Sequence, residues 1–450
     1  MALSTLLLCL SLTAIIRAAP LMDGSTTTAS VTKRYTNSGK GVYAHYMIGN
    51  TYSYTQSDWQ TNIQLAESAG IDGFALNVGS LDWEPARVAD AYAAAEALNT
   101  GFKLFISLDM TSLACAATTD ADLIRSYVNN YTTHPNQLYY SDNLILSSFD
   151  GSGCLFGQAT FDAGWNYALR TGTNANIWFI PAFFVDPSTF GSITSMNGIF
   201  QWNAGWPSGD VDTTWTDSTW ITDVGDRAYI APVSPLFFTH YGVDSYNKNW
   251  IYRSDDWLFA SRWEELIANR DSIDFVEIIT WNDFGESHYI GPIAPDSDQP
   301  NSQAWTDGFD HQAYLTVNKY YATAWKTGTY PAITENQIFL TARPHSKSAV
   351  CTSDSVGQPT GAAMSDDNLY ALVFAAEAGS VVLTIGSSTG TFSVTAGVNK
   401  LKIPLAVGSP TAVFTSSTGA ILVNFAPSGF SYTGSVCSLY NFNYYAAISS

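Results

Sequence analysis

Apolar runs typical of strands alternate with segments of helical period from position 42 to about position 326. The expected strands span residues 42–48, 73–78, 102–108, 144–149, 177–185, 198–203, 228–233 and 275–280. The expected helices span residues 58–69, 84–98, 120–131, 161–169, 216–223, 255–269 and 311–325. Nearly continuous apolar strands separated by helices indicate a parallel sheet that helices cover.

Eight strands in this length favour a closed barrel over an open doubly wound sheet. No glycine-rich nucleotide fingerprint follows the first strand, which further disfavours a dinucleotide-binding fold. We therefore expect the α/β class, with a (β/α)8 TIM barrel over residues 35–333.

The pattern changes after about Thr334, where short apolar runs alternate with turns rich in Ser, Thr and Gly. The expected strands there span residues 369–374, 381–385, 391–394, 400–404, 412–415 and 420–425. Closely spaced short strands without helical period predict an all-β sandwich over residues 334–450. A GxSxG sequence at 386–390 falls in one of the turns, so we interpret it as a chance match to the hydrolase motif.

The N-terminus carries features of a secreted precursor. An apolar run at residues 3–16, followed by Arg17 and small residues, is typical of a signal peptide, which we place at residues 1–19. A Ser- and Thr-rich stretch then ends in Lys33-Arg34, so we interpret residues 20–34 as a pro-segment. The alternatives are a buried first helix and an uncleaved leader. Secretion implies an extracellular location, either free or associated with a cell wall.

Composition narrows the classes of function. Charged residues make up only 13% of the chain, aromatic residues make up 14%, and the net charge is −20. A chain this aromatic can bury ample apolar surface, which argues against disorder. Its negative charge repels phosphates, which argues against nucleic-acid partners. Only the N-terminus has a long apolar run, which argues against membrane spans. We expect a monomer.

Four cysteines remain after Cys9 is removed with the signal peptide. Secretion makes disulfides the default, and four cysteines allow three connectivities. We favour the pairs Cys115–Cys154 and Cys351–Cys437, because each bridge then stays within one domain. The sequence Asn130-Tyr131-Thr132 is an N-glycosylation sequon and should lie on the surface if it is used.

Acidic and aromatic residues follow the expected strands, at the end where barrel enzymes build their sites. This combination suits a neutral, hydroxyl-rich substrate, because sugars stack on aromatic rings while carboxylates and amides bind their hydroxyls. Asp109 follows the third strand, and Asp283 and Glu286 follow the eighth. Glycoside hydrolysis requires one carboxyl group to protonate the leaving oxygen and another to activate water or attack directly. These three residues are therefore our catalytic candidates.

Each catalytic candidate also has a structural alternative. Asp283 and Glu286 could complement a helix N-terminus, and Asp109 could cap a helix. Against this, two carboxylates cannot both be buried as unpaired ions, and the residues after Asp109 are typical of a loop. A charged Asp283 should raise the pKa of Glu286, as a general acid requires.

Other polar and aromatic residues near the strand ends are candidate substrate contacts. They are His45, Asn77, Trp202, Asn203, Trp206, His240, Tyr241, Trp281, Asn282, His288 and Tyr289. The alternatives are hydrogen-bonding neighbours for the histidines and core packing for the tryptophans. The sequence contains no HExxH and no His–acid cluster with ligand spacing, so we expect no metal.

Several sequence blocks carry a family resemblance. They include GVYAHYMIGNTYSYTQSDW, FKLFISLDM, YIAPVSPLFFTHYG and ITWNDFGESHYIGPI, in order between about Val42 and Trp325, and SLYNFNYY near the C-terminus. Together they closely resemble family 71 of the glycoside hydrolases, the fungal α-1,3-glucanases or mutanases. The resemblance implies endo-hydrolysis of α-1,3-glucan from fungal walls or bacterial polymer, with inversion and without a cofactor. It also implies that Asp109, Asp283 and Glu286 are the essential carboxylates.

On this basis we hypothesise that Glu286 is the general acid and Asp283 the base. An inverting pair needs room for water, so these groups should stand about 6.5–9.5 Å apart. Asp109 would then orient the sugar hydroxyls or share in water activation.

Two other functions stay open. A non-catalytic wall-binding protein would use the same aromatic and acidic rim, and an exo-acting glycosidase of the related family 99 type would use the same carboxylates. The C-terminal region either binds glucan or braces the barrel. We favour bracing, because no Trp occurs after Trp325.

Overall fold

The computed structural model of the chain describes residues 39–207 and 216–450. The expected signal peptide at residues 1–19 and pro-segment at residues 20–34 lie outside this part. Across the described ranges, no helix combines the length and the apolar character needed to cross a membrane.

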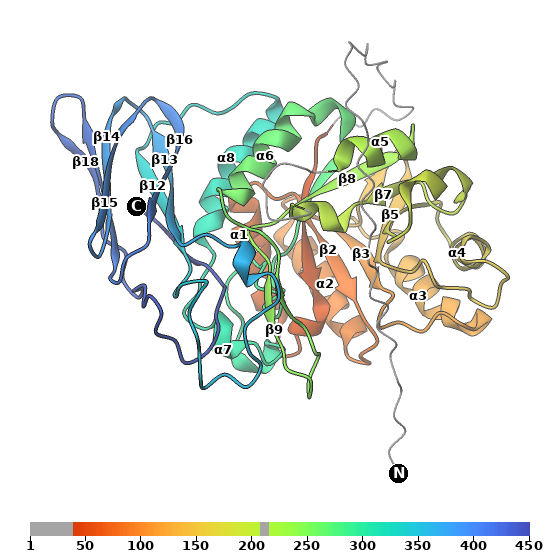
Figure 1. Cartoon of the computed structure of the whole chain (residues 1–450). Coiled ribbons are helices and arrows are strands. Elements are labelled where there is room, and N and C mark those ends of the chain that lie inside the picture. Colours follow the sequence, from red (N-terminus) through yellow and green to blue (C-terminus); the bar gives the residue numbers. More distant parts are fainter. Residues whose placement is uncertain (1–38, 208–215) are drawn as a thin grey trace, which may run out of the picture. The chain divides into compact units, whose positions relative to one another are not determined.

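Eight parallel strands form a curled sheet in the first part of the chain (Figure 1). They are β1 (Val42–Met47), β2 (Gly73–Val78), β3 (Lys103–Asp109), β5 (Asn143–Phe149), β6 (Ile177–Ala182), β7 (Gly198–Phe200), β8 (Ala228–Val233) and β11 (Phe275–Ile278). Their hydrogen-bonded order is β6, β5, β3, β2, β1, β11, β8, β7. The Asn197 N–H, just before β7, donates to the Phe179 carbonyl of β6 (2.7 Å) and links the two ends of this order.

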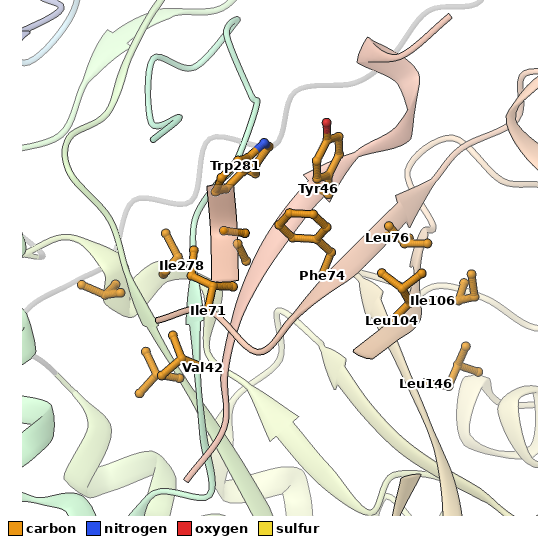
Figure 2. Packing of buried hydrophobic residues seen from close by; sticks show 14 of the residues in the cluster. Val42, Tyr46, Ile71, Phe74, Leu76, Leu104, Ile106, Leu146, Ile278 and Trp281 are labelled. Atoms are coloured by element: carbon orange, nitrogen blue, oxygen red, sulfur yellow. The ribbon is translucent and has the colours of Figure 1, made fainter. Parts of the chain in front are cut away.

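The strands separate two hydrophobic cores, because successive side chains of a strand point to opposite faces. Val42 and Tyr46 of β1 belong to the larger core, and Figure 2 shows Tyr46 beside Phe74 of β2. Tyr43 of β1 and Phe105 of β3 belong to the smaller core, where their rings meet edge to face at 5.5 Å. The apolar alternation of the strands therefore sets which residues reach the inside of the curled sheet.

Helices connect the strands at nearly the expected positions. They are α1 (Gln56–Ser68), α2 (Glu84–Leu98), α3 (Ala121–Tyr131), α4 (Phe161–Arg170), α5 (Asp217–Val224), α6 (Leu258–Ala268), the short α7 (Gln303–Thr306) and α8 (Ala313–Thr327). Helix α6 begins three residues later than expected, because Asp256 and Trp257 adopt positive φ angles of 54° and 58°. Asn130 is exposed on α3.

A hairpin that the sequence did not predict follows β8. Its strands β9 (Phe238–His240) and β10 (Asn249–Ile251) pair antiparallel and are only three residues each. Strands this short leave no alternating pattern to detect. A second short strand, β4 (Tyr139–Tyr140), pairs antiparallel with β5.

Two antiparallel four-stranded sheets form the C-terminal part. One has the order β16 (Gly397–Pro404), β13 (Asn368–Ala375), β12 (Gln337–Ala342), β19 (Tyr445–Ile448). The other has the order β15 (Ser388–Val394), β14 (Gly379–Ile385), β17 (Pro410–Ser416), β18 (Ile421–Phe425). Residues of both sheets, such as Leu340, Leu383 and Phe414, share one core. The GxSxG match lies across the β14–β15 turn, and strands β12 and β19 were not predicted.

Contacts between the curled sheet and the C-terminal part are extensive. The Arg343 guanidinium lies 2.6 Å from the Asp255 carboxylate, and both side chains are buried. The Tyr444 hydroxyl donates to the same carboxylate (2.9 Å). Disulfides link Cys115 to Cys154 and Cys351 to Cys437.

Candidate active site

The loop after β11 closes on itself and gathers its polar residues. The Thr280 N–H donates to the His288 carbonyl (2.6 Å), and the Ile290 N–H donates to the Thr280 carbonyl (3.0 Å). Because these two bonds hold the ends of the loop together, Asp283 and Glu286 are confined to a short closed segment at the carboxyl end of β11.

Asp283, Glu286 and His288 form a hydrogen-bonded cluster in this loop. His288 Nε2 lies 3.0 Å from Glu286 Oε2 and 3.9 Å from Asp283 Oδ2. Asp283 Oδ1 accepts the Glu286 backbone N–H (3.1 Å), and the Asp283 N–H donates to the Thr280 hydroxyl (2.8 Å). His288 is fully buried, whereas 15% of the Asp283 side chain and 19% of the Glu286 side chain are exposed. Solvent and small solutes therefore reach the two carboxyl groups.

Lys248 adds a positive charge to the cluster. Its Nζ lies 3.2 Å from Glu286 Oε1, and 45% of its side chain is exposed. Lys248 precedes β10 of the unpredicted hairpin, and the Phe238 N–H of β9 donates to the Glu286 carbonyl (3.0 Å). Lys248 was not predicted as a site residue, because its contact with Glu286 depends on this hairpin and leaves no local signal in the sequence.

The two carboxyl groups are displaced in opposite directions on the pKa scale. Burial raises the pKa of Asp283, and the charge of Glu286 raises it further. Burial also acts to raise the pKa of Glu286, but hydrogen bonds and charges from His288 and Lys248 outweigh it, and this pKa is lowered. The expected raised pKa of Glu286 is therefore wrong, because His288 and Lys248 both contact that carboxylate. Burial and the neighbouring charge therefore favour the neutral form of Asp283, whereas His288 and Lys248 favour the ionised form of Glu286.

The spacing of the pair also differs from the expectation. One oxygen of Asp283, one oxygen of Glu286 and a nitrogen of His288 all lie within 4.8 Å of one another. An inverting acid and base stand about 6.5–9.5 Å apart, because a water molecule fits between them and the sugar. Asp283 and Glu286, three residues apart in one closed loop, lack that separation.

These three side chains also form a donor set that could hold a cation, although their spacing in the sequence did not predict a metal site. The Lys248 ammonium already lies 3.2 Å from Glu286, however, and repels a second positive charge at this carboxylate. We therefore interpret the cluster as acid–base machinery.

Asp109 lies at the same end of the curled sheet as Asp283 and Glu286, but on a different strand. It ends β3, which the sheet order separates from β11 by β2 and β1. Its Oδ1 accepts the Thr111 N–H (3.0 Å) and the Thr111 hydroxyl (2.6 Å), as in an Asx turn. Burial acts to lower the pKa of Lys248, but the charges of Glu286, Asp283 and Asp109 raise it. All three carboxylates therefore act on one lysine.

Two expected aromatic contacts lie beside the cluster. The ring of His288 lies 5.6 Å from the ring of Trp206 and 6.2 Å from that of Trp202. Trp202 also meets the ring of His45 edge to face at 4.9 Å. Asn203 is exposed on the same segment. The structure thus places these residues near the carboxylates, but Trp202 and Trp206 are buried (8% and 3% exposed) and belong to the smaller core, so they do not form an open stacking platform.

His45 and Asn77 are buried on strands β1 and β2. His45 Nδ1 lies 2.7 Å from Glu277 Oε1 of β11, and both side chains are 1% exposed. Glu277 was not predicted as a site residue, although a carboxylate inside the apolar run 275–280 is a readable signal.

Three expected contacts lie in cores, and we correct them. Trp281 is fully buried and donates its indole N–H to Asn62 of α1 (2.7 Å). Asn282 exchanges hydrogen bonds with the backbone of Met47 (2.7 and 3.0 Å). Tyr289 is buried against His311, with ring centroids 4.2 Å apart. Side chains packed in this way cannot stack on or bind a sugar.

Two further expected contacts connect elements. His240 is buried, with Nδ1 2.9 Å from Asn249 Oδ1 and Nε2 2.8 Å from Asp354 Oδ2. Tyr241 is buried and donates its hydroxyl to the Pro300 carbonyl (2.6 Å). Both side chains have their polar groups engaged by the protein, so we correct these assignments to structural roles.

Comparison with known proteins gives matches over almost the whole chain. The profile of glycosyl hydrolase family 71 matches residues 38–450. The glucan endo-1,3-alpha-glucosidase agn1 of Schizosaccharomyces pombe is 38% identical over 92% of this chain and 95% of its own length. The ascus wall endo-1,3-alpha-glucanase of the same organism is 32% identical over 92% of this chain and 98% of its own. A mutanase of Penicillium rubens is 33% identical over 90% and 88%.

The fold, the carboxylate cluster and these matches define an enzyme of the glycoside hydrolase class. Within that class, the chain belongs to glycosyl hydrolase family 71.

Proposed function

We propose that this enzyme is secreted and cleaves α-1,3-glucan internally. The observation that carries the proposal is the similarity to endo-1,3-α-glucanases over nine tenths of the chain, together with the carboxylate cluster at the strand ends. Residues 35–333 form the (β/α)8 catalytic barrel and residues 334–450 a β-sandwich. The enzyme acts as a monomer, outside the cell or at the wall, and needs no cofactor.

In the mechanism we propose, the Asp283–Glu286 pair is the proton donor. Asp283 holds the proton and gives it to the glycosidic oxygen as the bond to the anomeric carbon breaks. Glu286, which stays ionised next to Lys248, stabilises the positive charge that develops on the sugar. The sequence-based hypothesis had Glu286 as the acid and Asp283 as the base. The proposed acid is instead Asp283, because the cationic partner lies on Glu286.

Asp109 is the base in this proposal. It lies on a different strand from the pair, and only its Oδ1 has a hydrogen-bond partner among the described residues. Asp109 removes a proton from a water molecule, whose oxygen attacks the anomeric carbon opposite to the leaving oxygen. The attack converts the α-linkage into a β-configured product, and the proton gained by Asp109 balances the one lost by Asp283.

The first experiment incubates the purified protein with insoluble α-1,3-glucan and identifies the products. Oligosaccharides support the proposal, glucose alone indicates an exo-acting enzyme, and binding without release indicates a wall-binding protein. Proton NMR of the first products then assigns the stereochemistry. A β-anomer supports inversion with Asp109 as base. An α-anomer indicates retention, with the close Asp283–Glu286 pair as acid and nucleophile.

Chemical rescue tests the individual roles. Asp283→Ala should lose activity on glucan but keep it on a substrate with a good leaving group, which needs no protonation. Asp109→Ala should recover turnover only when azide is added, because azide replaces the activated water. Rescue of Asp283→Ala by azide would contradict the assignment.

A further inference from the structure

A cleft of about 560 Å³ opens next to the carboxylate cluster. Its volume lies in the range of about 300–1,000 Å³ typical of ligand sites. Residues after β7 and around β10 line one part, namely Asn203, Trp206, Trp250, Tyr252 and Arg253. Thr360, Gly361 and Met364, which precede β13, line the other part. Both parts of the chain therefore form its walls.

The wall that includes Thr360 is firmly attached to the hairpin. The Ile251 N–H of β10 donates to the Thr360 carbonyl (2.9 Å), and the Thr360 N–H donates to the Asn249 carbonyl (3.0 Å). Arg253 donates to the Met364 carbonyl (2.8 Å). These bonds extend the hairpin by a strand-like segment, so the wall keeps a fixed distance from the residues opposite.

Two links hold the start of this segment. The disulfide between Cys351 and Cys437 ties it to the C-terminal part. Asp354 binds His240 of β9 (2.8 Å) and accepts the Tyr440 N–H (2.8 Å). The buried His240 therefore serves the wall of the cleft rather than the substrate itself.

Trp206, which lines the cleft, connects its wall to the catalytic cluster. The Trp206 ring lies 5.6 Å from the His288 ring and 5.4 Å from the Tyr252 ring. Burial is the main cause that raises the pKa of Tyr252, and the charge of Glu286 adds to it. A chain that has one sugar at the carboxylates would extend along these rings.

The lining offers what a neutral sugar chain binds. Tyr252 supplies an aromatic ring that is 36% exposed, beside the partly buried Trp250, while Trp206 is 3% exposed and packs behind them. The buried Trp206 Nε1 and Arg253 Nε have no hydrogen-bond acceptor in the described part of the chain. The Arg253 charge is compensated by Asp256 (2.5 Å), so the cleft does not select an anion.

We propose that this cleft binds the glucose units next to the cleaved bond, with Tyr252 as the stacking platform and the Thr360–Met364 segment as a specificity wall. The inference rests on the proposed hydrolysis of α-1,3-glucan. It assigns the C-terminal part a direct share in substrate binding, beyond bracing.

The test uses Tyr252→Ala in the full-length enzyme, assayed on α-1,3-oligosaccharides of defined length. Loss of the ring should raise KM about tenfold, the size of a truncated binding hot spot, while kcat changes less than twofold. Tyr252→Phe keeps the ring and should restore most of the affinity. Tyr139→Ala is the matched control, because 38% of Tyr139 is exposed and it lies on β4, outside the cleft.

A second variant, Met364→Trp, tests the wall. A larger side chain narrows the cleft and should shift the products of glucan digestion towards different lengths, with cleavage retained. Unchanged KM in Tyr252→Ala together with unchanged products in Met364→Trp would overturn the inference. Absence of glucan hydrolysis by the wild-type enzyme would instead overturn the proposed function.

Discussion

The carboxylate of Asp255 and the carboxyl pair of Asp283 and Glu286 lie at the same end of the curled sheet. They differ in how completely the protein provides hydrogen-bond and charge partners for them. Asp255 is buried, and both of its oxygens are engaged. Arg343 and the Tyr444 hydroxyl bind Oδ1 (2.6 and 2.9 Å), and the Asp366 N–H donates to Oδ2 (3.2 Å). A buried charge with this many partners is a permanent structural connection.

Asp283 and Glu286 lie partly exposed and close to each other. Lys248 contacts Glu286 but not Asp283. The pKa values of the two carboxyl groups therefore move apart, because burial raises the pKa of Asp283, whereas His288 and Lys248 lower the pKa of Glu286. Such an arrangement favours the neutral form at Asp283 over that at Glu286. The comparison teaches that saturated carboxylates join the two parts of the molecule, while the unevenly satisfied pair is suited to chemistry.

The largest effect should come from removing the ionisable groups of the pair. We expect Asp283→Asn and Glu286→Gln each to lower kcat by roughly 10³- to 10⁴-fold, in the upper range of what acid–base catalysis contributes. Stability should not fall in Asp283→Asn, because the raised pKa of Asp283 marks an unfavourable charge, whereas Glu286→Gln loses the contacts with His288 and Lys248 that lower its pKa and should be somewhat less stable. Kinetics on α-1,3-oligosaccharides and thermal unfolding measure the two quantities. Asp122→Asn, which removes the exposed carboxylate of an ion pair with Arg125 on α3, is the control. If Asp283→Asn or Glu286→Gln kept a tenth of the wild-type kcat, the distinction between a catalytic pair and the structural Asp255 would fail.

The Asp255 connection should respond in the opposite way. Arg343→Met leaves a buried carboxylate without its partner and should lower the free energy of unfolding by about 3–5 kcal/mol. At temperatures where the variant is folded, kcat should stay near the wild-type value. Denaturant unfolding followed by fluorescence measures the loss.

Two controls sharpen this second prediction. The double variant Arg343→Met/Asp255→Asn removes both charges and should recover part of the lost stability. Lys402→Met breaks an exposed pair with Asp256 and should cost about 1 kcal/mol or less. Equal losses in Arg343→Met and Lys402→Met would show that burial does not distinguish the two pairs.

The sequence predicts the curled sheet well, because its strands are nearly continuous apolar runs. It predicts the hairpin β9–β10 and strand β19 poorly. These strands are three or four residues long, and their partners are fixed by contacts distant in sequence. The loops that carry the site residues are harder to predict than the strands of the curled sheet, because contacts distant in sequence also fix their positions.

The same distinction applies to the site. Asp283 and Glu286 are three residues apart, so the sequence alone identifies them together as candidate catalytic residues. Trp281, only two residues away from Asp283, continues the backbone ladder of β11 by donating its N–H to the His45 carbonyl (2.7 Å), and its side chain lies in the core beside α1. Nearness in sequence does not reveal which face a side chain takes. Lys248 lies 38 residues from Glu286 and could not be assigned without the fold.

The smallest effect we predict concerns Lys248, which contacts Glu286 but not Asp283. Its positive charge lowers the pKa of both Asp283 and Glu286. Removing the charge in Lys248→Met should therefore raise both pKa values of the pair. The proposed mechanism needs one proton on the Asp283–Glu286 pair. Activity is therefore lost as the pH rises through the higher of the two pKa values of the pair, and the alkaline limb of the pH–rate profile should move to higher pH.

Measurement of kcat/KM between pH 4 and about 9 checks this shift, because that profile reports the free enzyme. We expect a displacement of about one pH unit or less, since Lys248 is half exposed and water screens its charge. Lys248→Arg keeps the charge and should leave the limb in place, as should Lys402→Met, which lies on another ion pair. A shift to lower pH in Lys248→Met would mean that the alkaline limb does not report the proton on Asp283, and the proposed donor would have to be reassigned.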